Sequence, residues 1–431
     1  MRKSHDSGAS ARTNLPVHAV GAKLSCAKLS GMADGRTYQI KVYDTPLAQF
    51  QFEKTLTGFR ARDLEVDENL AHLLPLNIMQ SPDDVELARF LNSRRIPKGR
   101  AYLEEVLRPY GLSPNDTKGI IDLSRGASVN DAYSVVPVED DIPWSDYNLF
   151  DNDFDEVLQV IAYTGAIPEG VVGTGRPSDL TPSGAFPKTW RKIDGELILY
   201  KAGSVMAAPH YGREPYSEAL AWQVAQAGMF NAVPYHLEEW HDKLCSTCAL
   251  FNTADVSFVP FDLCLPSATM QLCDLELALA YFGDIGEEAA DELRSMAVFD
   301  AIIANSDRHT GNFGVLRDNA TGRVFGMAPI FDNNVSLFAR DFDESLQLDA
   351  MLSRVAEAPG ILDATLDKQA VVLLGETQRS QLERLEDFRF DGSGFIDEYR
   401  HTHPAGKTIG EARLVALGGF VRARARQFLA Q

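Results

Sequence analysis

Apolar residues recur at helical spacing over Leu293–Ala304, which predicts a buried helix that ends just before Asn305. Two short apolar runs follow, Phe313–Leu316 and Val324–Ile330. The segment Asp318–Gly322 separates them and has the composition of a tight turn, so we expect the two runs to pair as a β-hairpin. The pattern therefore predicts a helix, a polar loop and a hairpin in succession, followed by a second acidic loop.

A strand and a helix are predicted further upstream. Apolar and polar residues alternate over Glu196–Lys201, which is the period of a half-buried strand. The segment Glu214–Gly228 is expected to be helical, because Pro215 stands early in it and Glu218 follows about one turn in.

The first part of the chain predicts a separate module. Residues 1–37 are polar and rich in Ser, Ala and Gly, so we expect them to be weakly ordered. Tyr38–Phe59 is expected to form a strand hairpin, and Asp83–Arg95 and Gly99–Tyr110 are expected to be helices. Gly165–Pro177 has the composition of a linker. These boundaries predict four parts: a weakly ordered segment (1–37), an accessory module (38–164), a β-rich unit (165–265) and a helical unit (266–431).

The polar loop after the predicted helix carries candidate chemistry. Asp307 and Asn312 stand five residues apart, and Asp332 follows the hairpin. This spacing is typical of a kinase catalytic loop, in which the Asp accepts the proton of the substrate hydroxyl and the Asn holds Mg²⁺. A second Asp from a separate loop completes such a metal site. The alternative is a solvated loop in which Asp307 and Asn312 only form caps and turns.

Phosphoryl transfer also needs cations for the phosphates of ATP. Lys201 ends the predicted strand, and Glu218 is placed to pair with it. The loop Thr181–Lys188 contains one glycine, two hydroxyls and a lysine, and it is not a Walker A loop. The backbone near Phe251–Thr253 or Val259–Phe261 is expected to hold adenine. The alternative for Lys201 is a lysine at the end of a strand that reaches solvent. The alternative for Glu218 is an ordinary carboxylate in the first turn of a helix.

Five motifs of the chain occur in the order seen in HipA-like kinases, which they resemble. They are Thr181–Lys188, Ile198–Lys201, Ser217-Glu218 with Val233-Pro234, Asn305–Phe313 and Pro329–Asp332. These are bacterial serine/threonine kinases, best known as toxins of toxin–antitoxin pairs. The resemblance implies an α+β, protein-kinase-like fold with a small β-rich N-lobe and a mostly helical C-lobe. The residues before it would form an additional N-terminal α/β module.

The resemblance also implies a role for each matched residue. Asp307 would be the catalytic base, and Asn312 and Asp332 would be the Mg²⁺ ligands. His309 belongs to the same string and would orient the loop by hydrogen bonds. Residues implied to bind ATP are Lys201, Glu218, Ser183, Gly184, Ala185, Phe186 and Lys188. Thr181 and Ser183 are the candidates for autophosphorylation, which would expel the loop and switch the enzyme off.

Three functions remain open from the sequence. The first is an ATP- and Mg²⁺-dependent Ser/Thr protein kinase with a protein substrate and an antitoxin-type partner protein. The second is a kinase of a small molecule or lipid headgroup on the same fold. The third is a non-catalytic regulatory protein, which is disfavoured because Lys201, Asp307, Asn312 and Asp332 are all present.

Composition narrows the setting in which the protein acts. The formal net charge of −20 disfavours direct nucleic-acid binding, although the two predicted helices before Gly111 have the spacing of a helix-turn-helix. No secretion signal or membrane span is recognisable, so we expect a cytoplasmic protein with five reduced cysteines. His241, Cys245 and Cys248 resemble half of a zinc site, but the spacing of the remaining cysteines fits a zinc site poorly.

Overall fold

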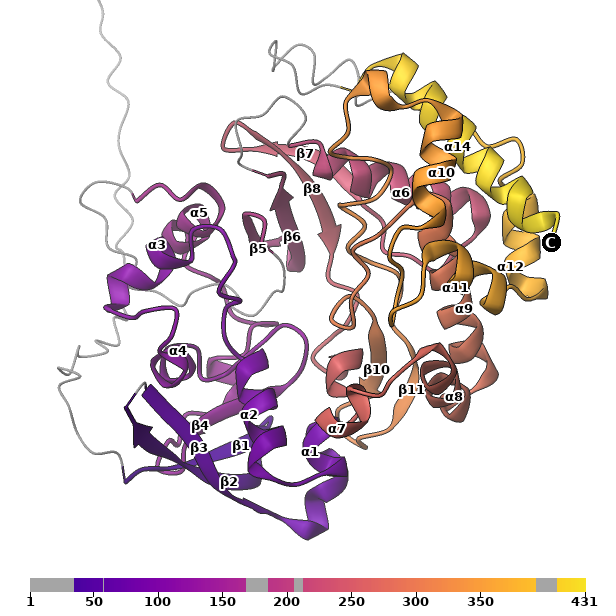
Figure 1. Cartoon of the computed structure of the whole chain (residues 1–431). Coiled ribbons are helices and arrows are strands. Elements are labelled where there is room, and N and C mark those ends of the chain that lie inside the picture. The colour runs from indigo at the N-terminus through magenta and orange to yellow at the C-terminus, as the bar shows by residue number, and fades with distance from the viewer. Residues whose placement is uncertain (1–34, 57, 168–184, 205–211, 393–408) are drawn as a thin grey trace, which may run out of the picture. The chain divides into compact units, whose positions relative to one another are not determined.

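The computed structural model describes residues 35–56, 58–167, 185–204, 212–392 and 409–431. These residues form a mixed α+β structure with three antiparallel sheets in the described part of the chain (Figure 1). No helix among them is long and apolar enough to cross a membrane. Most of the segment expected to be weakly ordered, residues 1–34, lies outside the described residues, as do Thr181, Ser183 and Gly184.

The first sheet is built from the N-terminal part of the chain. Its strands, in the order in which they pair, are β3 (Gly58–Val66), β2 (Thr45–Thr55), β1 (Thr37–Val42) and β4 (Tyr133–Pro137). The hairpin expected over Tyr38–Phe59 is confirmed as β1 and β2. The strand β3 was not predicted, because charged residues such as Arg60 and Arg62 face solvent along it. The expected α/β module therefore contains an antiparallel sheet.

Short helices accompany this sheet. They are α1 (Leu76–Gln80), α2 (Asp84–Ser93), α3 (Leu103–Leu107), α4 (Thr117–Ser124) and α5 (Glu156–Thr164). The helix expected over Asp83–Arg95 is confirmed, and the Asp83 carboxylate caps it by accepting from the amides of Val85 and Glu86. The helix expected over Gly99–Tyr110 was predicted too long. Residues 94–102 separate α2 from α3, which is longer than the turn of a helix-turn-helix.

The second sheet contains the strand that ends in Lys201. Its strands, in pairing order, are β5 (Lys188–Ile193), β6 (Glu196–Ala202), β8 (Lys243–Ala249) and β7 (His236–Trp240). The alternation over Glu196–Lys201 is thus confirmed as a strand, and the helix expected after it is α6 (Glu214–Gly228). Cys245 and Cys248 are buried on β8, where burial raises the pKa of each thiol to about 12. In the described residues, no three His, Cys, Asp or Glu side chains are grouped so that they could hold a metal ion.

The third sheet and the remaining helices form the C-terminal part. The strands pair in the order β11 (Val324–Met327), β10 (Gly314–Asp318) and β9 (Val256–Pro260). The helices are α7 (Ser267–Met270), α8 (Leu275–Ile285), α9 (Glu287–Ile303), α10 (Leu348–Ala356), α11 (Leu366–Leu373), α12 (Glu376–Glu383) and α14 (Glu411–Leu429). The predicted buried helix is α9, and the predicted hairpin is β10 and β11. Its turn is held by Asp318, whose carboxylate accepts from the amide of Thr321.

The largest apolar core surrounds α9. Leu293, Met296, Phe299 and Ile303 on this helix are fully buried. They pack in one cluster with residues of α6, α8, α11 and α14 and of strand β10, and Figure 1 shows α8, α11 and α14 around α9. The apolar periodicity read from the sequence therefore reflects a helix that is covered on nearly every side.

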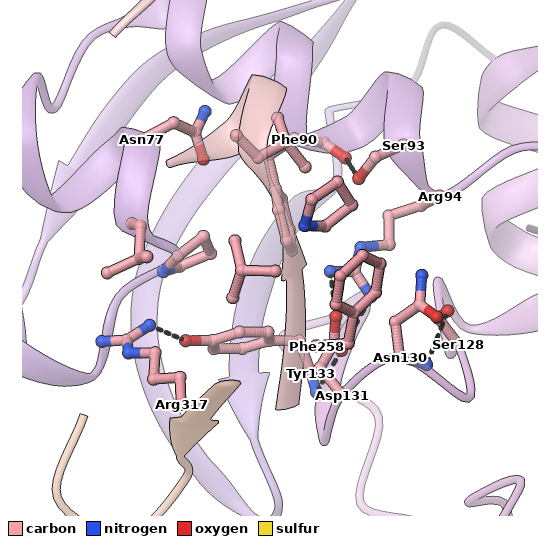
Figure 2. Close-up of a pocket in the computed structure, with 15 residues that line it drawn as sticks. Asn77, Phe90, Ser93, Arg94, Ser128, Asn130, Asp131, Tyr133, Phe258 and Arg317 are labelled. Carbon is pink, nitrogen blue, oxygen red and sulfur yellow. Dashed lines mark hydrogen bonds and ion pairs between the residues drawn. The ribbon is translucent and has the colours of Figure 1, made fainter. Parts of the chain in front are cut away.

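A buried arginine joins the N-terminal part to the β10–β11 hairpin. Arg317 of β10 is 1% exposed and donates to the carbonyls of His72 and Leu74 at 2.6 and 2.7 Å and to the Tyr133 hydroxyl at 2.7 Å. Figure 2 shows this side chain at the edge of a cavity of about 40 Å³. On the other side of the cavity, Arg94 forms two hydrogen bonds with Asp131. The residues central to the predicted chemistry do not line this cavity; they are Lys201, Asp307, Asn312 and Asp332.

Gly314 lies where the loop after α9 enters β10, and it has no room for a side chain. A Cβ at this position would lie 2.0 Å from the Val259 carbonyl oxygen on β9. We expect Gly314→Ala to force the two strands apart and to lower the free energy of unfolding by about 1–3 kcal/mol or more. Urea denaturation measures the change.

The matched control is Gly326→Ala on β11, where a Cβ would meet no heavy atom within 4 Å. This variant should be as stable as the wild type or more stable by about 0.4–1 kcal/mol, because alanine restricts the unfolded chain. Equal stability of the two variants would contradict the close approach at Gly314.

Candidate functional site

The loop that follows α9 is held by an ion pair inside the core. Helix α9 ends at Ala304, which adopts a left-handed conformation (φ 54°) and turns the chain out of the helix. Asp300, in the last turn of the helix, accepts from Arg308 at 2.9 Å through both of its oxygens. Both side chains are fully buried. Asn305 adds a hydrogen bond of 3.0 Å from its side-chain amide to Asp300.

The same arginine also reaches the acidic loop after the hairpin. Arg308 donates to the carbonyl oxygens of Asn312 and Phe331 and, at 2.7 Å, to the side-chain oxygen of Asn333. One guanidinium group therefore sets the position of the loop that carries Asp307 and of the loop that carries Asp332. All of its partners are acceptors, as a buried cation requires.

Lys201 lies between two carboxylates. Its ammonium group donates to Glu218 at 2.9 Å and also contacts Asp332. Burial disfavours the charge, but the two carboxylates outweigh it and raise the pKa of Lys201. Glu218 is fully buried on α6, and its second oxygen accepts from the amide of Asn333 at 3.0 Å. The pair expected from the sequence is present, and it is linked to the acidic loop.

Asp332 is held in its ionised form. Its backbone has a φ of 57°, in the left-handed region, and its amide donates to the Tyr235 hydroxyl at 3.2 Å. Burial opposes ionisation, but the positive charges of Lys201 and Lys188 outweigh it and lower the pKa of Asp332 to about 2. The carboxylate is therefore negative at neutral pH.

The side chain of Asn312 has features that suit a metal ligand. The residue is 2% exposed, and its side-chain amide group donates to the Asp307 carbonyl at 3.4 Å. Its side-chain oxygen is buried and has no hydrogen-bond partner among the described residues. A buried acceptor without a donor is costly unless something positive occupies the space beside it. An oxygen of this kind together with an ionised aspartate fits Mg²⁺, which binds through a few protein oxygens and substrate phosphates.

Asp307 and His309 lie on the exposed side of the same loop. The Asp307 amide donates to the side-chain oxygen of Asn305 at 3.2 Å, while its carboxylate has no hydrogen-bond partner in the described part of the chain. Partial burial and the charge of Asp332 raise the pKa of Asp307. The imidazole of His309 accepts from the amide of Gly311 at 3.1 Å, so it shapes the loop as expected from the sequence.

Only the end of the expected phosphate loop lies in the described residues. Lys188 begins β5 and is the cross-strand neighbour of Lys201 on β6. It is 3% exposed, and burial together with the charge of Lys201 lowers its pKa to about 7. The Ala185 carbonyl accepts from the amide of Ala101, and the Phe186 ring lies under the guanidinium of Arg340 at 5.6 Å. Two lysines thus stand side by side next to Asp332.

Three residues important for this arrangement were not identified from the sequence: Asp300, Arg308 and Asn333. Asp300 carried a usable signal, because it is an acid within the otherwise apolar run that becomes the buried face of α9. A charge in that position needs a buried partner. The pairing of Asp300 with Arg308 could have been inferred from this requirement.

Comparison with solved structures places the fold. The structure of the toxin–antitoxin system HipA, HipB and its operator DNA from Shewanella oneidensis MR-1 matches 91% of this chain and 97% of its own, with a TM-score of 0.53 and 13% identity. The chain has a HipA-like fold. The proinflammatory kinase CtkA of Helicobacter pylori also matches, with a TM-score of 0.43 and 19% identity over 58% of this chain and 90% of its own. No family model and no curated protein matches the sequence.

The HipA-like fold confirms the resemblance read from the five sequence motifs at the level of the fold. At 13% identity the likeness does not extend to the chemistry of single residues. The roles of Lys201, Asp307, Asn312 and Asp332 therefore depend on the geometry of this chain alone.

The buried ion pair leads to the first prediction at this site. Arg308→Met should lower the free energy of unfolding by about 3–5 kcal/mol, because it leaves the Asp300 carboxylate buried without its cation. The double variant Arg308→Met/Asp300→Leu should recover part of that loss, since both charges are then gone. Urea denaturation of the three proteins measures both effects.

The control is Arg294→Ala on α9, whose side chain is partly exposed and pairs with Glu287 and Asp291, which are 84% and 36% exposed. Its expected cost is about 0–1 kcal/mol. The assignment is wrong if Arg308→Met costs no more than this surface variant.

The second prediction concerns the pH dependence of stability. The pKa of Lys188 is about 7 in the folded protein and 10.5 as the ordinary value, so between these values the unfolded chain binds a proton that the folded protein does not. Stability must therefore rise with pH across this window through Lys188. We expect the free energy of unfolding of Lys188→Met relative to the wild type to fall steadily between pH 7.5 and 9.5. A constant difference would show that Lys188 keeps its ordinary pKa.

Proposed function

We propose that this chain is an ATP- and Mg²⁺-dependent phosphotransferase, and specifically a Ser/Thr protein kinase of the HipA-like type. The observation that carries the proposal is the position of Lys201, held between Glu218 and Asp332. A lysine fixed by a helix carboxylate and placed against an ionised aspartate is the arrangement that nucleotide phosphates and their metal require.

Each residue has a physical task in this proposal. Lys201 and Lys188 bind the phosphates of ATP, and Lys201 exchanges part of its contact with Asp332 for contact with the nucleotide. Asp307 accepts the proton of the acceptor hydroxyl, which its solvent-exposed position and free carboxylate permit. Asn312 and Asp332 would hold Mg²⁺, which neutralises charge on the phosphates when it is bound.

An apolar surface for the base of ATP lies beside the site. The rings of Phe251, Phe258 and Phe331 lie 5.3–5.4 Å from one another, and Phe331 directly precedes Asp332. Phe251 belongs to the segment expected from the sequence to lie near adenine. We infer that a flat base packs against this aromatic group.

The proposal also covers the organisation of the chain. Residues 165–265 and 266–431 would act as the two lobes of a protein-kinase-like enzyme, with 38–164 as an accessory module. HipA in the Shewanella structure is in a complex with HipB, so we propose that this chain also has an antitoxin-type protein partner. Autophosphorylation at Thr181 or Ser183 stays a prediction, because both residues lie outside the described part of the chain.

Transfer of label from γ-labelled ATP tests the function. We expect Asp332→Asn to abolish phosphotransfer at saturating Mg²⁺ while the protein stays folded, because the variant loses the charge that retains the metal. Purified protein is incubated alone, with cell extract and with a small-molecule fraction of that extract. Label on protein supports a protein kinase, and label on small molecules supports the alternative acceptor class.

The matched control is Asp387→Asn, which removes a fully exposed carboxylate and should leave transfer unchanged. Thermal unfolding of both variants checks that the fold is intact. Transfer by Asp332→Asn at a rate near that of the wild type would refute the assignment of this aspartate.

A further inference from the structure

Arg340 is a half-exposed cation close to the proposed site. It lies eight residues after Asp332, and its side chain is 42% exposed. Its Nε is 3.3 Å from a carboxylate oxygen of Glu214, and the guanidinium lies 5.6 Å from the centre of the Phe186 ring. Its charge also acts on Asp307, where it opposes the increase in pKa caused by burial and Asp332. Arg340 thus contacts the end of the phosphate loop and acts electrostatically on the proposed catalytic base.

The arginine is anchored from one side. Its partner Glu214 is buried at the start of α6, and one oxygen of this carboxylate accepts from the amides of Ser204 and Gly212. Glu214 is therefore a fixed acceptor. Only Nε of Arg340 is engaged, and its two terminal amino groups have no hydrogen-bond partner in the described ranges. They form the fork with which arginine binds a carboxylate or a phosphate.

Other arginines nearby use a terminal amino group for their acidic partners. Arg213 and Arg413 share one oxygen of Asp343, at 3.0 and 2.7 Å. Arg354 pairs with Asp341 through one terminal amino group. Among these four arginines of the described residues, Arg340 is the one whose terminal amino groups are both open. The chain has a net charge of −20, so the exposed positive charge of Arg340 has the opposite sign to most charges of the protein.

We propose that Arg340 binds an anionic side chain of the acceptor protein, close in sequence to the hydroxyl that is phosphorylated. The anion is a carboxylate or a phosphate, since the open fork accepts either. The phosphates of ATP already have Lys201 and Lys188, whereas Arg340 lies against Phe186 at the end of the phosphate loop and its charge reaches Asp307, which the acceptor must approach. This inference rests on the proposed protein kinase function and assigns its substrate class, a Ser or Thr with an acidic neighbour.

Kinase reactions on a positional peptide library test the proposal. The probes are Ser- and Thr-centred peptides in which each flanking position is fixed in turn as Asp, phosphothreonine, Asn or Lys. The wild type should label peptides with Asp or phosphothreonine at one flanking position about tenfold faster than their Asn counterparts, as expected for a charge-assisted hydrogen bond. The ratio between the Asp and phosphothreonine peptides tells which anion is preferred.

Variants of Arg340 separate recognition from general activity. Arg340→Ala should lose the preference for an anion while still labelling Asn peptides, and Arg340→Glu should prefer Lys at the same position. The control is Arg62→Ala, because Arg62 is an exposed arginine of similar exposure (45%) that also has one acidic partner. It should keep the preference of the wild type.

Several results would overturn the inference. One is a wild type that shows no preference for an anion at any position or that labels none of the peptides. Another is an Arg340→Ala variant with the preference unchanged. A third is an equal increase of its KM for ATP with every peptide, which would place Arg340 on the nucleotide. Binding of Mg–ATP is measured in parallel. A wild type that binds and uses ATP but shows no preference for an anion in the peptide refutes this inference alone. A wild type that neither binds nor uses ATP refutes the proposed function as well.

Discussion

The site depends on one buried ion pair, between Arg308 and Asp300. A guanidinium taken out of water must have all its donors satisfied, and the acceptors here come from the end of α9, from the loop after it and from the loop after the β-hairpin. Phe331 and Asn333 follow Arg308 by 23 and 25 residues, and this one side chain joins their loop to the loop after α9. The constraint sets the positions of the two loops that carry Asp307, Asn312 and Asp332.

A second electrostatic unit is built on this frame. Lys201, Lys188, Glu218 and Asp332 are all largely buried, so their charges interact strongly. Burial acts against every one of these charges, yet the two outcomes differ. The pKa of Asp332 falls to about 2, which favours its charged form, whereas the pKa of Lys188 falls to about 7, which favours its neutral form. The difference comes from the sign of the neighbouring charges. Asp332 has two lysines near it, whereas Lys188 has another cation as its cross-strand neighbour. A ligand rich in negative charge would relieve the repulsion between the two lysines.

The N-terminal part of the chain is connected to this machinery through backbone and buried polar groups. Arg317 lies on β10, the strand that follows the Asp307 loop, and donates to the carbonyls of His72 and Leu74. In a second connection, the amide of Phe258 on β9 donates to the carbonyl of Asn130. The cavity shown in Figure 2 lies at this junction. The buried side-chain oxygen of Asn77 and Nε of Arg94 line it without a hydrogen-bond partner in the described residues, which is typical of sites that hold ordered water. The junction is therefore polar and specific in its geometry.

Local sequence patterns were enough to predict several helices and strands and the candidate chemistry. Helical periodicity located α9, alternation located β6, turn composition located the β10–β11 hairpin, and the spacing of Asp307 and Asn312 indicated phosphoryl transfer. These signals are local, since each depends on residues within a few turns or one strand. Other features depend on how the chain folds: Arg308 pairs with Asp300, Lys188 is buried beside Lys201, and Arg340 lies against Phe186. A side chain's partners and its access to water depend on segments far apart in the sequence, and no local pattern records which of them meet.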